Sequence, residues 1–155
     1  MLLKGKKAIV TGGARGIGKE IVMDFLREGA SVTFIDLNPS DAIAEMEQAA
    51  NASGVTVSFR AGNVADPAGI TALLEQIIGE AGSIDILVNN AGITRDGLIF
   101  RMPLEQWEKV LTINLTSAFL CSQVVARHMI KQRRGSIINM ASIVGVGGNA
   151  GQANY

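Results

Sequence analysis

The chain has 155 residues, enough for one domain with a single core, and 48% of them are apolar while 18% are charged, which excludes a disordered chain. Lysine plus arginine equals aspartate plus glutamate at 14 each, so neither a nucleic acid nor an anionic membrane is expected as the main partner. We expect no signal peptide and no membrane span, because no run of about 18 apolar residues occurs. A single cysteine fits a reducing, cytoplasmic compartment.

Strand and helix patterns alternate along the whole chain. Strands are predicted at 7–11, 31–36, about 55–59, 84–89 and 136–140, and helices at 17–28, about 38–53, 67–81 and 103–133. Asn38-Pro39 and Asp66-Pro67 are interpreted as helix caps followed by a first-turn proline. No linker or repeat divides the chain, so this alternation predicts one domain at 1–155, with a parallel sheet covered by helices on both faces.

A glycine-rich loop, residues 11–18 (TGGARGIG), joins the first predicted strand to the first predicted helix. Its glycine spacing differs from the strict G-x-G-x-x-G pattern, but its place after a strand and at the start of a helix is typical of a dinucleotide site. Glycines let the backbone approach a pyrophosphate, and the helix N-terminus supplies N–H donors. A glycine-rich turn without a ligand is the less favoured alternative. The candidate cofactor residues in this loop are Gly12, Arg15, Gly16, Ile17 and Gly18.

The second predicted strand ends in an acid, Asp36, about 20 residues after the loop. A carboxylate there can bond the ribose 2′-hydroxyl of NAD and would repel the 2′-phosphate of NADP. Arg15 argues in the other direction, since it could pair with a 2′-phosphate. We therefore expect NAD, with NADP as the alternative. Another interpretation is that Asp36 only starts a turn before Asn38.

Further motifs follow the loop in a definite order: Asn89-Asn90-Ala91-Gly92, then Asn114 within the long helix, then Ser142 with Tyr155 thirteen residues later. Together with the loop, this order resembles the short-chain dehydrogenase/reductase family, and the resemblance covers the whole chain. Residues 89–102 (NNAGITRDGLIFRM) and 151–155 (GQANY) look like its 3-oxoacyl-[acyl-carrier-protein] reductase branch. The resemblance implies an α/β fold with a Rossmann-type, doubly wound parallel sheet of strand order 3-2-1-4-5.

The resemblance also implies catalytic roles. Ser142 would hydrogen-bond the substrate carbonyl, and Tyr155 would protonate its oxygen as hydride reaches the carbon. A phenol with a pKa near 10 needs a lowered pKa to act at neutral pH, and in the family a lysine four residues later and the nicotinamide ring provide this. Asn114 would support that lysine through water. An amide in an otherwise apolar helix fits a kinked turn, although from the residues alone a polar side chain on the solvent face is favoured.

Cofactor contacts beyond the loop are likewise implied by the resemblance. Asn90, Ala91 and Gly92 would border the cofactor ribose in a segment that stabilises the central sheet. Asn63 and Val64 would lie beside the adenine ring, while the alternative for Asn63 is a turn at a strand end.

No metal site is expected. His128 is the only histidine and has no Cys, Asp or Glu at ligand spacing. Cys121 lies among apolar residues, which indicates a buried, inert thiol.

The resemblance predicts an oxidoreductase that transfers hydride between NAD(P)H and a 3-oxoacyl thioester. An NAD-dependent dehydrogenase of another alcohol, sugar or hydroxyacyl substrate is one alternative, and a non-catalytic dinucleotide-binding fragment is another. Arg133 matches a family position for docking acyl carrier protein. It lies in a basic cluster at a helix end, where such cations also satisfy helix carbonyls and the helix dipole.

The family lysine, the rest of its helix, the last strands and the substrate lid all lie beyond Tyr155 in the family pattern, and this sequence ends at that tyrosine. We therefore expect a domain that is incomplete at its C-terminus, and a 155-residue chain that is inactive. The intact protein is expected to be an active homo-oligomer, because the same absent helix forms much of the family's subunit interface.

Overall fold

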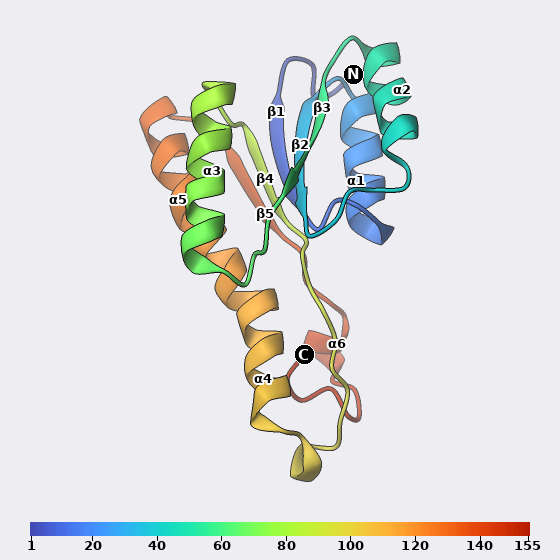
Figure 1. Ribbon diagram of the computed structural model, residues 1–155, viewed down its shortest axis with the longest axis vertical. Coiled ribbons are helices and arrows are strands. Elements are labelled where there is room, and N and C mark those ends of the chain that lie inside the picture. The colour runs from blue at the N-terminus through green and yellow to red at the C-terminus, as the bar shows by residue number, and fades with distance from the viewer.

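A five-stranded parallel sheet organises the computed structural model, which describes residues 1–155 (Figure 1). The strands are β1 (Lys7–Thr11), β2 (Ser31–Asp36), β3 (Val57–Ala61), β4 (Ile86–Asn89) and β5 (Ser136–Asn139). Their order is β3-β2-β1-β4-β5, which confirms the predicted order 3-2-1-4-5 and the Rossmann-type, doubly wound fold. The order reverses between β1 and β4, and ligands of such sheets bind at the carboxyl ends of the strands beside this point.

Helices cover both faces of the sheet. On one side α1 (Gly16–Arg27) packs with α2 (Ile43–Ser53), and on the other α3 (Pro67–Ala81) packs with α5 (Ser117–Gln132) (Figure 1). Successive side chains of a strand point to opposite faces, so each strand contributes to two cores.

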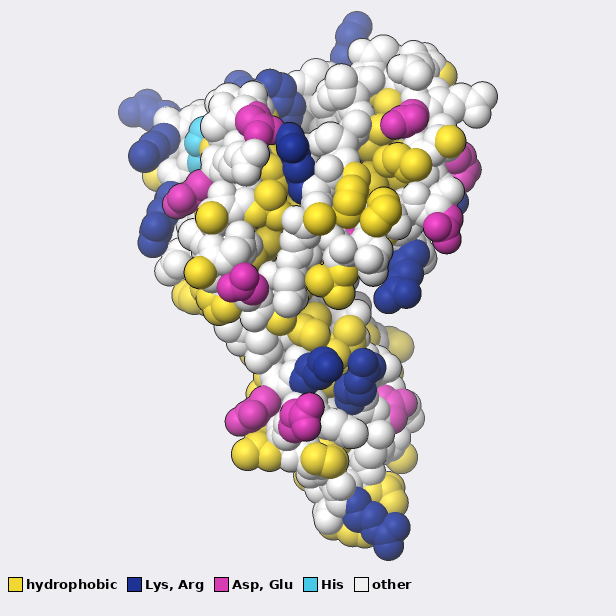
Figure 2. Space-filling model, in the orientation of Figure 1, with side chains coloured by type: hydrophobic (Ala, Val, Ile, Leu, Met, Phe, Trp, Pro, Cys, Tyr) yellow, Lys and Arg dark blue, Asp and Glu magenta, His cyan; other side chains and the backbone are white.

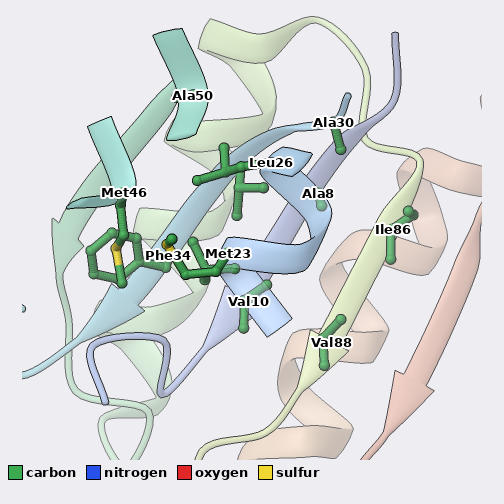
Figure 3. Packing of buried hydrophobic residues seen from close by; sticks show 12 residues of the cluster. Ala8, Val10, Met23, Leu26, Ala30, Phe34, Met46, Ala50, Ile86 and Val88 are labelled. Atoms are coloured by element: carbon green, nitrogen blue, oxygen red, sulfur yellow. The ribbon is translucent and has the colours of Figure 1, made fainter. Parts of the chain in front are cut away.

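The core beneath α1 and α2 shows how β2 is fixed. Phe34 of β2 is fully buried and lies close to Met23 of α1 and Met46 of α2 (Figure 3). Its neighbour Ile35 points the other way, into the second core with Ile9 of β1. The strand β2, which ends in Asp36, therefore packs into a hydrophobic core on each face of the sheet.

Most predicted elements are confirmed, and the clearest error is the start of α2. This helix begins at Ile43, with Ala42 as its cap, and Asn38-Pro39 lies outside it. A buried serine explains the difference, because the Ser40 hydroxyl accepts a hydrogen bond from the Ala42 amide at 3.1 Å and forms a local turn that competes with the helix. By contrast, α3 begins at Pro67 after Asp66, as its cap signal predicts.

The predicted long helix is one continuous run with an irregular turn inside it. It consists of α4 (Leu104–Leu111), the π-helical turn η2 (Thr112–Thr116) and α5. The short helices η1 (Ile99–Arg101) and α6 (Val144–Gly147) lie beside α4, and together they form a lobe beyond the carboxyl ends of β4 and β5 (Figure 1). Apolar side chains are exposed at the waist between this lobe and the sheet (Figure 2).

By length and composition, the same helical run, Leu104–Gln132, could cross a membrane, whereas no membrane span was predicted from the sequence. The structure gives it another role, because Cys121, Val125 and Met129 of α5 are buried against the sheet. The α5 part of this run is therefore a core helix of the α/β fold.

The thiol of Cys121 is expected to be unreactive in the folded chain. Burial raises its pKa from the usual 9.0 to about 11, and only the thiolate is nucleophilic. At pH 8 we expect iodoacetamide to alkylate the folded chain at least about 100-fold more slowly than the urea-unfolded chain, which follows from ionisation alone. The unfolded thiol ionises first, so the folded state should lose stability as the pH rises from 9.0 to about 11. Equal alkylation rates would contradict this prediction.

Candidate functional site

Two adjoining cavities lie at the carboxyl ends of the strands, beside the switch point between β1 and β4. The loop cavity, of about 330 Å³, is lined by the glycine-rich loop and the end of β2. The tyrosine cavity, of about 1020 Å³, is lined by the η2 turn, α5 and the segment after β5, including Tyr155. The cavities share Ile17 and residues 90–93 as a common wall, so a long ligand could extend from one into the other.

The loop cavity gathers nearly all of the predicted cofactor residues. Those that line it are Gly12, Arg15, Ile17, Gly18, Asp36, Asn63, Val64, Asn90, Ala91 and Gly92. Gly16 is the exception, since it starts α1 outside the cavity lining.

The glycine-rich loop is packed directly against the segment that follows β4. A Cβ atom on Gly18 would overlap the carbonyl oxygen of Gly12 and would lie 2.5 Å from Asn90 Nδ2. A Cβ on Gly12 would lie 2.9 Å from the Cα atom of Ala91, and Gly12 also has a positive φ of 68°. These two positions therefore require glycine, and Ile17 and Gly18 in the first turn of α1 line the cavity.

Hydrogen bonds join the loop to the Asn89–Gly92 motif. Asn90 Nδ2 donates to the carbonyl oxygens of Thr11 and Gly12 at 3.1 and 3.0 Å. In return, the Thr11 hydroxyl accepts bonds from the backbone amides of Asn90 and Ala91, both at 3.1 Å. Thr11 thus connects the glycine-rich loop to the Asn89–Gly92 motif, a role that was not predicted from the sequence.

The Asp36 carboxylate also contacts the loop. Its Oδ2 accepts a hydrogen bond from the Ala14 amide at 3.1 Å, and its Oδ1 accepts one from the Leu37 amide at 2.8 Å. Asp36 therefore has local backbone partners, while its side chain also lines the loop cavity together with Arg15. Asn63 behaves in the same way, because its Oδ1 accepts a bond from the Ala65 amide at 3.0 Å at the cavity edge.

Asn89, at the end of β4, joins the sheet to α5. Its Nδ2 donates to Asn139 Oδ1 of β5 at 2.8 Å and to the Ser122 hydroxyl at 3.0 Å. Asn89 and Asn139 are directly paired in the register of the two strands. Sequence reasoning missed Asn139 and Ser122, although the place of Asn139 at the end of its strand was a usable signal.

Asn114 occupies the middle of the π-helical turn and points inward. Its Oδ1 accepts a hydrogen bond from the Ile93 amide at 2.8 Å, and its Nδ2 donates to the Ile93 carbonyl at 2.9 Å. The alternative of a side chain on the solvent face is therefore wrong, and the turn that carries Asn114 is π-helical.

Asn114, Ser142 and Tyr155 all line the tyrosine cavity, so the structure brings the three predicted catalytic residues to one site. The Ser142 hydroxyl accepts a hydrogen bond from the Val144 amide at 3.2 Å, which leaves its own proton available. Arg133 lies elsewhere. It is exposed at the end of α5, in the left-handed conformation with φ 54°. It precedes β5 and so lies toward the amino ends of the strands, whereas the cavities lie at the carboxyl ends.

Histidine, cysteine and acidic side chains do not gather in any group of three or more that could hold a metal ion. The polar groups of both cavities are instead amides, hydroxyls, one carboxylate and one guanidinium.

Known proteins resemble this chain in both sequence and fold. The short chain dehydrogenase family matches residues 6–155. The chain is 48% identical over 153 residues to 3-oxoacyl-[acyl-carrier-protein] reductase FabG of Chlamydia pneumoniae, covering 99% of this chain and 61% of that protein. It is 46% identical over 157 residues to the FabG of Escherichia coli K12, covering 100% of this chain and 62% of that one.

A solved structure of NAD+-bound xylitol dehydrogenase superposes with a TM-score of 0.90 at 31% identity, covering 100% of this chain and 60% of that one. The chain thus spans about 60% of the length of the proteins it resembles. Because the family match extends over nearly every residue, with its motifs at the two cavities, the chain belongs to the short-chain dehydrogenase family.

Proposed function

We propose that these residues form the dinucleotide-binding domain of an oxidoreductase that transfers hydride between NAD(P)H and a 3-oxoacyl thioester. Short-chain dehydrogenases are oxidoreductases that use NAD or NADP. One observation carries the proposal to this chain: the glycine-lined loop cavity and the tyrosine cavity share residues 90–93 as a wall. A cofactor held by its phosphates in the first would extend toward Ser142 and Tyr155 in the second.

The residues of the loop cavity fit a dinucleotide. At Gly12 and Gly18 the space that a Cβ would fill is taken by backbone, so these two positions carry no side chain. A glycine turn at a helix N-terminus, which supplies N–H donors, suits a pyrophosphate. Asp36 would bond the adenosine ribose, and Asn63 with Val64 would border the adenine. When bound, the nicotinamide supplies the hydride.

In the tyrosine cavity, Tyr155 would donate its phenolic proton to the substrate oxygen as that oxygen becomes an alkoxide. Ser142 would donate a hydrogen bond to the same oxygen and so orient the carbonyl carbon. Asn114 would hold the 93–97 segment beside them and support the family lysine through water. Gly92, with Asn90 and Ala91, would border the cofactor ribose.

The relatives named 3-oxoacyl-[acyl-carrier-protein] reductase favour an acyl thioester as substrate. Apolar side chains on one wall of the tyrosine cavity, from Leu111, Leu115 and Phe119, suit an acyl chain. The resemblance to xylitol dehydrogenase favours a second candidate, an NAD-dependent dehydrogenase of another alcohol or sugar. Arg133 would contribute to the docking of acyl carrier protein. The intact protein would be a homo-oligomer. Its compartment would be the cytoplasm.

Turnover separates these candidates. NADH-dependent loss of a 3-oxoacyl thioester supports the first, and NAD+-dependent oxidation of a polyol or a simple alcohol supports the second. Because the 155-residue chain is expected to be inactive, these assays apply to the intact protein. Dinucleotide binding by the intact protein without turnover of either substrate would identify a non-catalytic binding module.

Replacing the phenol should separate chemistry from binding. Where turnover is measurable, Tyr155→Phe should lower kcat by about 10²-fold or more, the typical contribution of a general acid, and should leave the NADH dissociation constant unchanged. Stopped-flow turnover and NADH fluorescence titration measure the two quantities. An unchanged kcat would remove Tyr155 from the mechanism.

We further propose that NAD is preferred over NADP because Asp36 lies where a 2′-phosphate would have to be. Asp36→Ala should shift the ratio of NADH to NADPH affinity toward NADPH by about ten-fold, close to the effect of one charged hydrogen bond. Asp41→Ala, an exposed acid outside both cavities, is the matched control. A ratio that stays the same in Asp36→Ala would assign the selectivity to Arg15 or to another residue.

A further inference from the structure

The segment before Tyr155 is fastened to the loop that follows β4. The 149–154 segment, which we call the strap, pairs with residues 95–97. The Gly97 amide donates to the Gly151 carbonyl at 2.7 Å, and Gln152 Nε2 donates to Asp96 Oδ1 at 3.0 Å. Residues 96–97 and 151–152 are far apart in sequence, so these bonds attach the strap to the loop that follows β4.

Asn154 is the most enclosed member of the strap. Only 5% of its surface is exposed, although its neighbours Ala153 and Tyr155 are both exposed. Its Nδ2 donates to the carbonyl oxygen of Arg95 at 2.9 Å and lies 3.5 Å from that of Gln106. Because two carbonyl oxygens face this nitrogen, the hydrogen bonds of Nδ2 fix the orientation of the amide group. The Oδ1 atom has no hydrogen-bond partner.

The same loop is fixed from its other side by Asn114. The Asn114 amide pairs with both the amide and the carbonyl of Ile93, two residues before Arg95. Residues 93–95 are therefore held between two asparagines, one on the π-helical turn and one beside Tyr155. Both asparagines, Ile93 and Tyr155 line the tyrosine cavity.

We infer that Asn154 is a positioning residue, which sets the place of the Tyr155 phenol in the tyrosine cavity by anchoring the strap to the Arg95 carbonyl. The inference rests on the proposed function for the use of that phenol. A residue directly before Tyr155 in the chain cannot move without moving it, and an anchor on a loop already held by Asn114 fixes Tyr155 relative to the remainder of the site.

The chain contains one tyrosine, so a protein labelled with 3-fluorotyrosine gives a single ¹⁹F resonance from Tyr155. In the unmodified chain this resonance should be displaced from that of free 3-fluorotyrosine. Asn154→Ala should return it to the free position, and Asn154→Asp, equal in size but with a carboxylate facing two carbonyl oxygens, should do the same. Gln152→Ala is the matched control, since it removes a strap contact and keeps both bonds of Asn154.

Circular dichroism melting and NADH titration accompany the spectra. The NADH dissociation constant of Asn154→Ala should change by less than about two-fold, because Asn154 does not line the loop cavity. If Asn154→Ala is unfolded at the assay temperature, Asn154→Asp decides the question. A wild-type resonance in the folded Asn154 variants, or a free-tyrosine resonance in the unmodified chain, would overturn the inference. Absence of NADH binding would count against the proposed function alone, because the resonance still reports on the anchor.

Discussion

Gly18→Ala should weaken NADH binding by about 30-fold or more and destabilise the fold. The added methyl group would overlap the Gly12 carbonyl oxygen and press on Asn90 Nδ2, which bonds the same carbonyl. Neither contact can relax easily, because the first involves backbone and the second belongs to the link between the loop and the Asn89–Gly92 motif. Overpacking of this kind costs about 1–3 kcal/mol of folding free energy.

The effect on binding should be at least as large as the effect on stability. Moving Gly12 away from Gly18 reorients the backbone that would face the pyrophosphate, so a loss of about 2 kcal/mol, or about 30-fold in NADH affinity, is a lower estimate. Fluorescence titration with NADH and urea unfolding measure the two effects separately.

Gly79→Ala is the matched control for this glycine substitution. Gly79 lies in α3, a Cβ there meets nothing within 4 Å, and alanine favours a helix over glycine by up to about 1 kcal/mol. This variant should be equally or more stable and should bind NADH normally. If Gly18→Ala also bound NADH normally, the loop cavity could not be the dinucleotide site.

The order of the strands could be predicted because it depends on short-range patterns. Each strand is a brief apolar run and each helix has a regular apolar spacing, and parallel strands joined by helices admit few topologies. The start of α2 could not be predicted in the same way. There, one hydroxyl, that of Ser40, competes with a cap signal of ordinary appearance, and the outcome depends on Ser40 being buried.

The candidate site shows the same division. The loop glycines and Asp36 were identifiable from glycine spacing and a strand end, and the other cofactor residues from the family resemblance. All of them except Gly16 line the loop cavity. The bonds that join them were not, because they connect residues such as Thr11 and Asn90 that are 79 positions apart. Asn154 gave no sequence signal at all, since its burial arises only when the strap meets the 95–97 segment.

From the residues alone, the Asn114 side chain was expected on the solvent face, whereas the structure bonds it to Ile93. Its substitution is the second change for which we expect a large effect on stability. Asn114→Leu keeps the volume of the side chain but removes both bonds to Ile93. A half-buried amide and carbonyl would then be unpaired, at a cost of about 1–3 kcal/mol. We expect the midpoint of urea unfolding to fall accordingly, and the Ile93 amide to exchange with deuterium at least about ten-fold faster.

Asn51→Leu is the control for this change. Asn51 is exposed on α2, and its side chain makes no hydrogen bond, so the same substitution there should alter stability by no more than about 0.5 kcal/mol. The two variants separate a general effect of leucine from loss of the Asn114–Ile93 pair. If Ile93 exchanged at the same rate in Asn114→Leu as in the unmodified chain, the 93–97 segment would be held by the strap alone. The π-helical turn would then have no part in fixing the wall that the two cavities share.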